Sequence, residues 1–339
     1  MLLAYLGGEG AGEAIWHILS GKVSPSGKLA ETWPIHMMDV PSFGFYPGFA
    51  DFSLYKESIF VGYRYYLTAD KKVRFPFGHG LSYAKFKQDI KLSKKVVGEG
   101  DTLTVEVDVT NLSSMAVEKV IQIYIEPKES NIFRAKRTLA GFVKVALKGK
   151  EHRVVSIQLD HDTFSFYDRD TDAFAVEKGI YLIELAESSE EIISAVEVRV
   201  EGEEFQDLQV ALPVYYKPSQ ESFLMNDESF ETLLGHSFPS IVDHRSRPFN
   251  LNSTLDDISW TWVGKRIYKQ FEKMSNIDIN DPKNKNIVEP FRGTPIRNLG
   301  MGGGPFANPR VIYAILSLAN RRPLQAFFRL ITGLYGRNK

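Results

Sequence analysis

The chain has 339 residues, of which 43% are hydrophobic and none is cysteine, and its formal net charge is −1. This length predicts two or three domains with enough apolar material for real cores. The lack of cysteine excludes disulfides, thiolate nucleophiles and cysteine-based zinc sites, and the nearly balanced charge argues against nucleic acid as a partner. We expect a cytoplasmic protein, because a cysteine-free chain fits a reducing compartment, with no transmembrane segment and no secretion signal.

The opening of the chain predicts a strand, a glycine-rich turn and a helix. Residues 1–6 are continuously apolar, residues 7–10 hold three glycines, and helical spacing then runs from Ala11 to Leu19, with Gly21 placed to end the helix. A strand that is apolar on both faces is typical of a parallel sheet covered by helices, and such a sheet needs neighbouring βα units. We therefore expect residues 1–42 to be the terminal strand-helix piece of an α/β sandwich that belongs to a larger protein.

Residues 43–88 predict an aromatic, glycine-rich connector. The run from 31 to 54 is rich in Pro, Phe and Gly without a period, which predicts an ordered loop packed by its aromatic rings. The segment 75–83 reads Phe-Pro-Phe-Gly-His-Gly-Leu-Ser-Tyr. Glycine permits a positive φ and close backbone approach, so we expect a tight hinge in which Gly78 and Gly80 adopt backbone angles closed to other residues.

From residue 89 to 202 the apolar period is two. Alternation predicts strands around residues 103–109, 121–125, 143–147, 155–159, 181–185 and 196–200, with turn signals between them. About seven short strands with one apolar face each are typical of an immunoglobulin-like sandwich, here without its disulfide. The fold class is thus mixed: an α/β piece, then an all-β sandwich, then a helical extension.

Residues 203–339 predict that helical extension. We expect a short helix capped at Asn226 or Asp227, a longer one from about Asn252 through Met274, and two more beginning at Pro309 and Pro323. After Glu289 the sequence has no acidic residue but eight Lys and Arg. Basic amphipathic helices suit a membrane surface or an anionic partner, yet we favour the alternative that their apolar stripe docks on the protein's own body.

Residues 59–66 and 75–83 closely resemble the junction in glycoside hydrolase family 3, the β-glucosidase family, and residues 7–10, 24–29, 139–145, 164–168 and 176–181 also match. The resemblance implies that an α/β sandwich domain is joined here to a fibronectin-III-like domain at residues 89–202. It further implies a retaining hydrolase whose Asp nucleophile comes from a preceding barrel domain and whose acid/base Glu commonly comes from the earlier part of the sandwich domain. Ala135 stands where relatives often have proline, which affects only the local loop.

No residue of this chain matches those catalytic segments, so we predict no catalytic residue, no cofactor and no metal site. Glu9 is expected to face the start of its helix, where it would also repel a phosphate, and Glu57 to make a structural hydrogen bond to the junction. For His79 we expect a ring nitrogen bonded to a backbone carbonyl, and we disfavour a dyad with Ser82, which has no orienting acid in view. The histidines lack metal-site spacing: His17, His36, His79, His152, His161, His236 and His244.

The sequence leaves two hypotheses for the function of this chain. The first is the C-terminal part of a retaining β-glucosidase-like hydrolase that supplies scaffold and is inactive alone. Its partners would be the missing barrel and sandwich segments, with a β-glycoside bound only in the complete enzyme and homo-oligomerisation left open. The alternative is a non-catalytic fibronectin-III-like binding or assembly module with a basic amphipathic tail. The unpaired opening strand favours the first, because a stand-alone module would begin at a domain boundary.

Overall fold

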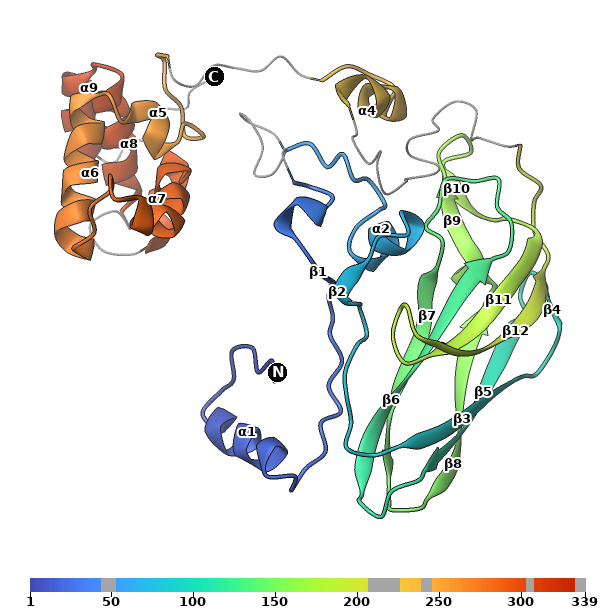
Figure 1. Cartoon of the computed structure of the whole chain (residues 1–339). Coiled ribbons are helices and arrows are strands. Elements are labelled where there is room, and N and C mark those ends of the chain that lie inside the picture. The colour runs from blue at the N-terminus through green and yellow to red at the C-terminus, as the bar shows by residue number, and fades with distance from the viewer. Residues whose placement is uncertain (44–52, 207–225, 239–245, 303–307, 333–339) are drawn as a thin grey trace. The chain divides into compact units, whose positions relative to one another are not determined.

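The computed structural model describes residues 1–43, 53–206, 226–238, 246–302 and 308–332, which fall into two compact units (Figure 1). Unit 1 consists of Met1–Gly44 and Tyr55–Ser237, and unit 2 of Phe45–Leu54 and Phe238–Lys339. Among the described helices, none is both long enough and apolar enough to cross a bilayer.

Unit 1 contains a β-sandwich preceded by short helices and strands. The elements before the sandwich are α1 (Ala11–Leu19), β1 (Trp33–Pro34), η1 (Met37–Asp39), α2 (Tyr63–Thr68) and β2 (Val73–Phe75). The sandwich comprises β3 (Phe86–Leu92), β4 (Val96–Val97), β5 (Thr102–Asn111), β6 (Val117–Pro127), β7 (Thr138–Leu147), β8 (His152–Asp160), η2 (His161–Phe164), β9 (Ser165–Asp168), β10 (Ala173–Val176), β11 (Gly179–Ala186) and β12 (Ile192–Val200). The helix α4 (Asp227–Leu234) follows.

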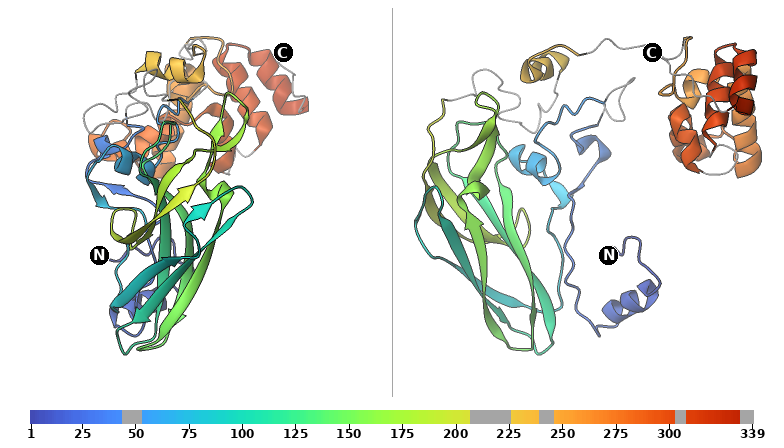
Figure 2. Two further views of the ribbon diagram at one scale, coloured as in Figure 1. Left: turned by 90° about the vertical axis from the view of Figure 1, so that its right-hand side faces the viewer. Right: turned by 180° about the vertical axis from the view of Figure 1, so that it is seen from behind.

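Two sheets form the sandwich, as the views in Figure 2 show. One has the strand order β4-β12-β11-β6-β7 and the other β3-β5-β8, while β9 and β10 make a separate two-stranded ribbon. Their facing side chains build one core, which includes Val105, Val107, Ile121, Ile123 and Ile183. The six strands expected from the period-two alternation are therefore confirmed, because each buries one apolar face against the opposite sheet.

The opening of the chain differs from its predicted structure in one respect. Helix α1 forms where the apolar spacing places it, and Gly21 follows it with φ +75°. Residues 1–6, however, form no strand, and several of their apolar side chains are exposed, such as Leu6 and Tyr5. A strand needs a hydrogen-bonded neighbour, and the described residues place none beside this segment. Part of the expected aromatic loop, residues 44–52, lies outside the described residues.

Unit 2 is helical. Its elements are α5 (Leu255–Ile258), α6 (Trp262–Ser275), η4 (Pro282–Asn284), α7 (Lys285–Arg292), η5 (Ile296–Gly302), α8 (Pro309–Ala319) and α9 (Pro323–Thr332). Helices α8 and α9 begin at the predicted prolines, and in unit 1 α4 has the predicted Asn226 cap. The core of unit 2 includes Leu255, Ile258, Ile267, Ile296, Ile312 and Ile315.

The long helix predicted from Asn252 to Met274 is wrong, because the structure has two helices there. Thr254 caps α5, and Thr261 caps α6 by accepting a hydrogen bond from the Gly264 N–H at 3.0 Å. A Cβ on Gly264 would lie 2.0 Å from the Ile258 carbonyl oxygen, so this glycine permits the sharp step between the two helices. The apolar spacing alone does not reveal such a step.

Within unit 2, helix α8 docks through its apolar stripe as expected, whereas helix α9 does not. Ile312, Ile315 and Leu316 of α8 are buried in the core of unit 2. On α9, in contrast, the large apolar side chains are exposed and an arginine, Arg329, is buried. The stripe of α9 thus faces away from the helices that it packs against.

Candidate functional site at the junction

Residues 24–29, here called the strap, pair with residues 78–83 of the junction. The Leu29 N–H donates to the His79 carbonyl at 2.8 Å, and the Gly78 N–H donates to the Leu29 carbonyl at 2.7 Å. Nearby, Ser24 Oγ accepts from the Tyr83 N–H at 3.0 Å. These bonds bring together two segments that lie some fifty residues apart in the sequence.

The two junction glycines are needed for different reasons. Gly78 has φ +79°, a backbone angle that residues other than glycine rarely adopt. The prediction made from the sequence is therefore correct for Gly78. For Gly80 that prediction is wrong, because its φ is not in the left-handed region. A Cβ on Gly80 would instead lie 2.3 Å from the Gly27 carbonyl oxygen. Gly80 therefore allows the close approach of the strap.

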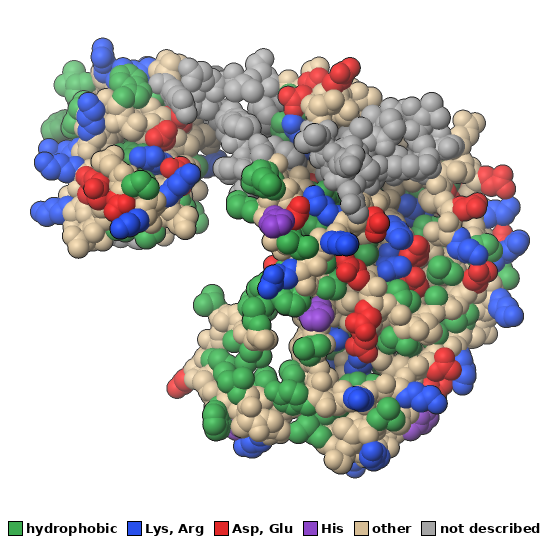
Figure 3. Space-filling view, in the orientation of Figure 1, with side chains coloured by type: hydrophobic (Ala, Val, Ile, Leu, Met, Phe, Trp, Pro, Cys, Tyr) green, Lys and Arg blue, Asp and Glu red, His purple; other side chains and the backbone are tan. Residues whose placement is uncertain are grey.

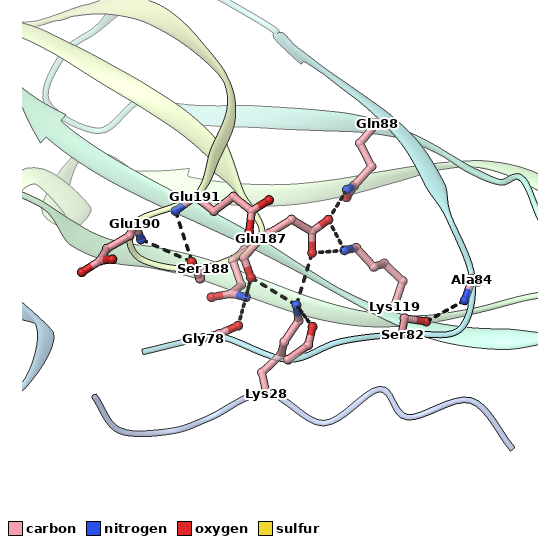
Figure 4. Close-up of polar contacts among 12 residues, drawn as sticks. Lys28, Gly78, Ser82, Ala84, Gln88, Lys119, Glu187, Ser188, Glu190 and Glu191 are labelled. Carbon is pink, nitrogen blue, oxygen red and sulfur yellow. Dashed lines mark hydrogen bonds and ion pairs between the residues drawn. The ribbon is translucent and has the colours of Figure 1, made fainter. Parts of the chain in front are cut away.

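A group of charged side chains, the Glu187 cluster, ties the strap to the sandwich (Figure 4). The Lys119 ammonium group donates to both carboxylate oxygens of Glu187, and Lys28 Nζ lies 3.2 Å from Glu187 Oε2. Gln88 Nε2 donates to Glu187 Oε1 at 2.9 Å, and Lys28 Nζ also donates to the Gly80 carbonyl at 3.0 Å. One carboxylate thus joins the strap to β3 and β6.

The electrostatics of this cluster follow from its two cations and one carboxylate. Burial favours the neutral form of Glu187, but the hydrogen bonds and charges of Lys119 and Lys28 outweigh burial and hold the pKa of Glu187 below its usual value. Burial also lowers the pKa of Lys119, although Glu187 opposes that shift. The side chain of Lys119 is only 5% exposed. A buried ammonium group is destabilising unless a carboxylate pairs with it, and Glu187 provides that carboxylate.

A second group, the Arg137 cluster, consists of Glu126, Arg137 and Glu184. Arg137 Nε donates to Glu126 Oε2 at 3.0 Å and lies 2.7 Å from Glu184 Oε2, although that oxygen has no partner in hydrogen-bond geometry. Arg137 Nη1 donates to the Ser189 carbonyl at 2.8 Å. Burial raises the pKa of Glu184 to about 7, because one arginine shared with Glu126 does not offset the loss of solvent.

The glutamates considered from sequence do not form a catalytic pair in the described residues. Glu9 is exposed in the turn before α1. Glu57 is 9% exposed, and its Oε2 atom has no hydrogen-bond partner, so the expected side-chain bond to the junction is not formed within the part of the chain described. Only the Glu57 backbone carbonyl is bonded in its turn, to the Phe60 N–H at 2.9 Å.

His79 and Ser82 also differ from a catalytic dyad. The His79 ring stacks on Phe75, with centroids 5.2 Å apart, instead of bonding a backbone carbonyl as expected. Ser82 Oγ lies 3.0 Å from Ser24 Oγ and accepts from the Ala84 N–H at 3.2 Å. Both side chains therefore hold the turn together. No group of three or more potential metal ligands gathers within the ranges that the structure describes.

A pocket of about 420 Å³ opens beside the Glu187 cluster and is lined by residues such as Lys28, Ser82, Phe86, Lys119 and Glu187. A general acid near neutral pH needs a raised pKa, whereas the pKa of Glu187 is lowered. Glu184 has the raised pKa but does not line this pocket, and its side chain is only 4% exposed. Hydrolysis of a glycoside needs both roles beside one cavity, so these residues suit a structural clamp rather than a catalytic site.

Comparison with known proteins identifies the domains that the clamp joins. Residues 1–83 match the model of the glycosyl hydrolase family 3 C-terminal domain, and residues 119–189 match that of the fibronectin type III-like domain. Thermostable beta-glucosidase B of Acetivibrio thermocellus is 42% identical over 201 residues, which is 59% of this chain and 27% of the relative. An exo-alpha-(1->6)-L-arabinopyranosidase of Bifidobacterium breve is 39% identical over 204 residues, 60% of this chain and 27% of the relative.

Solved structures similar to this chain are also beta-glucosidases. The family 3 beta-glucosidase of Bifidobacterium adolescentis matches with a TM-score of 0.56 at 32% identity and covers 78% of this chain and 33% of that one. The beta-glucosidase of Kluyveromyces marxianus matches with a TM-score of 0.53 at 37% identity, over 56% of this chain and 22% of that one. The matched residues of this chain correspond to the C-terminal portion of these glycoside hydrolase family 3 relatives. The chain spans about a quarter of the length of the curated relatives that it matches.

Sequence reasoning missed both clusters. Lys119 shares a strand face with Ile121 and Ile123, and Gln88 shares one with Ile90, so both are polar residues at positions that alternation assigns to the core. A lysine at an inward position is a usable signal, since buried lysines require a partner. Glu187 itself lies in a turn, and nothing in the local sequence indicates its role.

Proposed function

We propose that this chain is the C-terminal scaffold of a retaining β-glucosidase-like glycoside hydrolase, whose nucleophile and acid/base are supplied by segments outside these 339 residues. In this role the chain fixes the end of the α/β domain against the fibronectin-III-like domain. Terminal β-glucosides are the proposed substrates, because the Acetivibrio thermocellus relative, 42% identical, is named a beta-glucosidase.

The Glu187 cluster is the observation that carries this proposal. It connects the strap, which belongs to the region matched by the family 3 C-terminal domain, with strands of the sandwich. Gln122 strengthens the connection, because its Nε2 donates to the Gly78 carbonyl at 3.1 Å and to the Glu187 carbonyl at 2.8 Å. A network with this many satisfied polar groups holds one relative orientation of the two parts, as a scaffold must.

The described carboxylates support an inactive isolated chain. A retaining hydrolase needs two carboxyl groups roughly 5 to 5.5 Å apart on either side of the scissile bond. The carboxylates of Glu187 and Glu184 are engaged by lysine and arginine. Glu57 also has a buried oxygen, Oε2, that lacks a hydrogen-bond partner in the described ranges, and we assign it no catalytic role.

A chimera tests the proposal. Residues 1–206 of this chain would replace the matching segment of the Acetivibrio thermocellus beta-glucosidase, and turnover of an aryl β-glucoside would be compared with that of the relative truncated before this segment. We expect the chimera to be active and both the truncated relative and the isolated 339-residue chain to be inactive. A folded but inactive chimera would contradict the scaffold role.

Two variants separate the possibilities further. In the chimera, Glu187→Ala should reduce activity by loosening the clamp, whereas Glu197→Ala, which breaks an exposed pair with Lys128, should not. Turnover by the isolated chain that Glu57→Gln or Glu9→Gln abolished would make that glutamate catalytic and overturn the proposal.

A further inference from the structure

Helix α9 presents a stripe of large apolar side chains to solvent. Leu324, Phe327, Phe328 and Ile331 are 76%, 60%, 61% and 61% exposed. Their spacing of i, i+3, i+4 and i+7 places them on one face of the helix, here called the α9 stripe. Isolated exposed apolar residues are ordinary, but four such residues in one stripe mark a binding surface.

The stripe is held outward by the packing of the opposite face. Ala326 is buried against α8, and so is Arg329, whose Nη1 donates to the Tyr313 carbonyl at 3.3 Å and to Ser317 Oγ at 3.0 Å. These bonds fix the rotation of α9 about its own axis, because a buried guanidinium group must keep its hydrogen bonds. The exposure of the stripe is therefore a property of the docked helix.

The surroundings of the stripe are basic. Unit 2 has 16 Lys and Arg against 8 Asp and Glu, whereas unit 1 has 25 against 34. Figure 3 shows basic and hydrophobic side chains together over the helices of unit 2. Arg310, Arg321 and Arg322 are exposed beside the helix ends, and within the described ranges none of the three forms an ion pair. A negatively charged partner is thus favoured.

We propose that the α9 stripe binds the surface of an anionic lipid bilayer. A bilayer offers phosphate groups directly above hydrocarbon, which matches arginines placed beside an apolar helix face. Helix α9 would lie in the plane of the interface, with the stripe among the upper parts of the lipid chains and Arg321 and Arg322 at the headgroups. This attachment is independent of the function proposed for unit 1.

Charge and area argue against a second copy as the occupant. Cations stand on both sides of α9 in the sequence, Arg321 and Arg322 before it and Arg337 and Lys339 after it, so pairing of two α9 helices in either direction brings cations together. A ten-residue helix is also only about 15 Å long, so its stripe offers at most a few hundred Å², against roughly 800 Å² per partner in a stable dimer.

Vesicle sedimentation with the full 339-residue chain tests the proposal. We expect binding to phosphatidylcholine vesicles that contain about 30% phosphatidylglycerol, and a partition coefficient at least about tenfold lower on phosphatidylcholine alone, because each cation near an anionic surface contributes a factor of roughly five. The double variant Arg321→Gln/Arg322→Gln should lower binding to the mixed vesicles by roughly 25-fold.

A matched pair of phenylalanine variants tests the apolar part. Phe327→Ser should lower binding to the mixed vesicles at least roughly tenfold, since a Phe side chain no longer enters the interface. Phe142→Ser, at a 68% exposed phenylalanine on β7 in unit 1, should leave binding unchanged. Circular dichroism and thermal melts would show that both variants are folded as the wild type is.

Three outcomes would overturn the proposal: no binding to the mixed vesicles, equal binding to both vesicle types, or equal loss in the two phenylalanine variants. Sedimentation velocity without lipid tests a second copy of the chain as the occupant. If the chain does not bind vesicles but self-associates, and Phe327→Ser abolishes that self-association, the α9 stripe would be assigned to a second copy instead.

Discussion

The Glu187 cluster and the Arg137 cluster use similar residues on opposite sides of one sheet, with opposite electrostatic results. Lys119 lies on the face of β6 that carries Ile121 and Ile123, so the Glu187 cluster sits at the end of the space between the two sheets. Glu126 of β6 and Glu184 of β11 point to the outer face of the same sheet. Two cations share one carboxylate inside, and two carboxylates share one arginine outside.

The difference shows that the number of cations for each carboxylate decides the direction of the net pKa shift when burial is similar. Both glutamates lose solvent, which by itself raises the pKa of each. With an excess of lysine the pKa of Glu187 nevertheless falls below its usual value, whereas the pKa of Glu184 rises to about 7. We therefore expect the first cluster to be a clamp that is insensitive to pH near neutrality and the second to respond to pH.

The largest expected effect comes from Glu187→Ala. Removing this carboxylate leaves the Lys119 ammonium group buried and without its partner, which typically costs about 3 to 5 kcal/mol in the free energy of unfolding. Urea denaturation measures it. As a control, Glu197→Ala breaks the exposed Lys128–Glu197 pair and should cost less than about 1 kcal/mol. Equal losses in the two variants would show that the clamp is no stronger than a surface ion pair.

The second expected effect is a pH dependence that arises from Glu184. Its pKa is about 7 in the folded chain against an ordinary value of 4.5, so the folded state favours the protonated form. That contribution to stability is fully present below about pH 4.5 and is lost as the pH rises through 7. Between pH 5 and pH 8 it should lower the free energy of unfolding by on the order of 2 to 3 kcal/mol.

The variant Glu184→Gln should flatten this dependence, because a neutral amide does not titrate. Glu187, whose pKa is lowered, contributes in the opposite sense: its stabilisation is present above its unfolded pKa and is lost only in acid. Denaturation midpoints of the wild type, Glu184→Gln and Glu187→Gln at pH 5 and pH 8 compare them directly. If the free energy of unfolding falls equally in the wild type and in Glu184→Gln between pH 5 and pH 8, the proposed difference between the two clusters is wrong.

The smallest effect should come from Gly80→Val, which acts on the Glu187 cluster alone. The added side chain would collide with the Gly27 carbonyl and displace the strap that carries Lys28. We expect a loss of about 1 to 3 kcal/mol, and an undiminished pH response from Glu184. Gly8→Val is the control, since a Cβ at Gly8 meets no atom within 4 Å. Thermal melts that match those of the wild type would show that the strap tolerates a wider separation.

The sequence predicts the sandwich well, because alternation reports directly which face of a strand is buried. Caps and prolines likewise locate α4, α8 and α9, since each cap satisfies backbone groups within a few residues of itself. The break between α5 and α6 was not predictable in the same way. It depends on how closely the backbone at Gly264 approaches Ile258, which no spacing of apolar residues encodes.

The clamp was predictable only in part. Polar residues at inward positions, such as Lys119, indicate that a buried partner exists, but they do not say where in the sequence it lies. Glu187 and Lys28 are separated by 159 positions, and their meeting depends on the complete sandwich and on the path of the strap. Gly80 illustrates the same limit, because the close approach of Gly27 that requires a glycine there involves a segment far away in the sequence.

The outer face of the five-stranded sheet has a practical consequence for protein engineering. Tyr63 of α2 reaches it, with its ring centroid 6.2 Å from that of Tyr124 and its hydroxyl accepting a hydrogen bond from the Leu139 N–H at 3.0 Å. A graft that takes the sandwich from residue 89 onward would expose this surface to the new host and would deprive Glu187 of its ion pair with Lys28. For domain exchange between family members, the transferable module therefore begins before the strap rather than at the first strand of the sandwich.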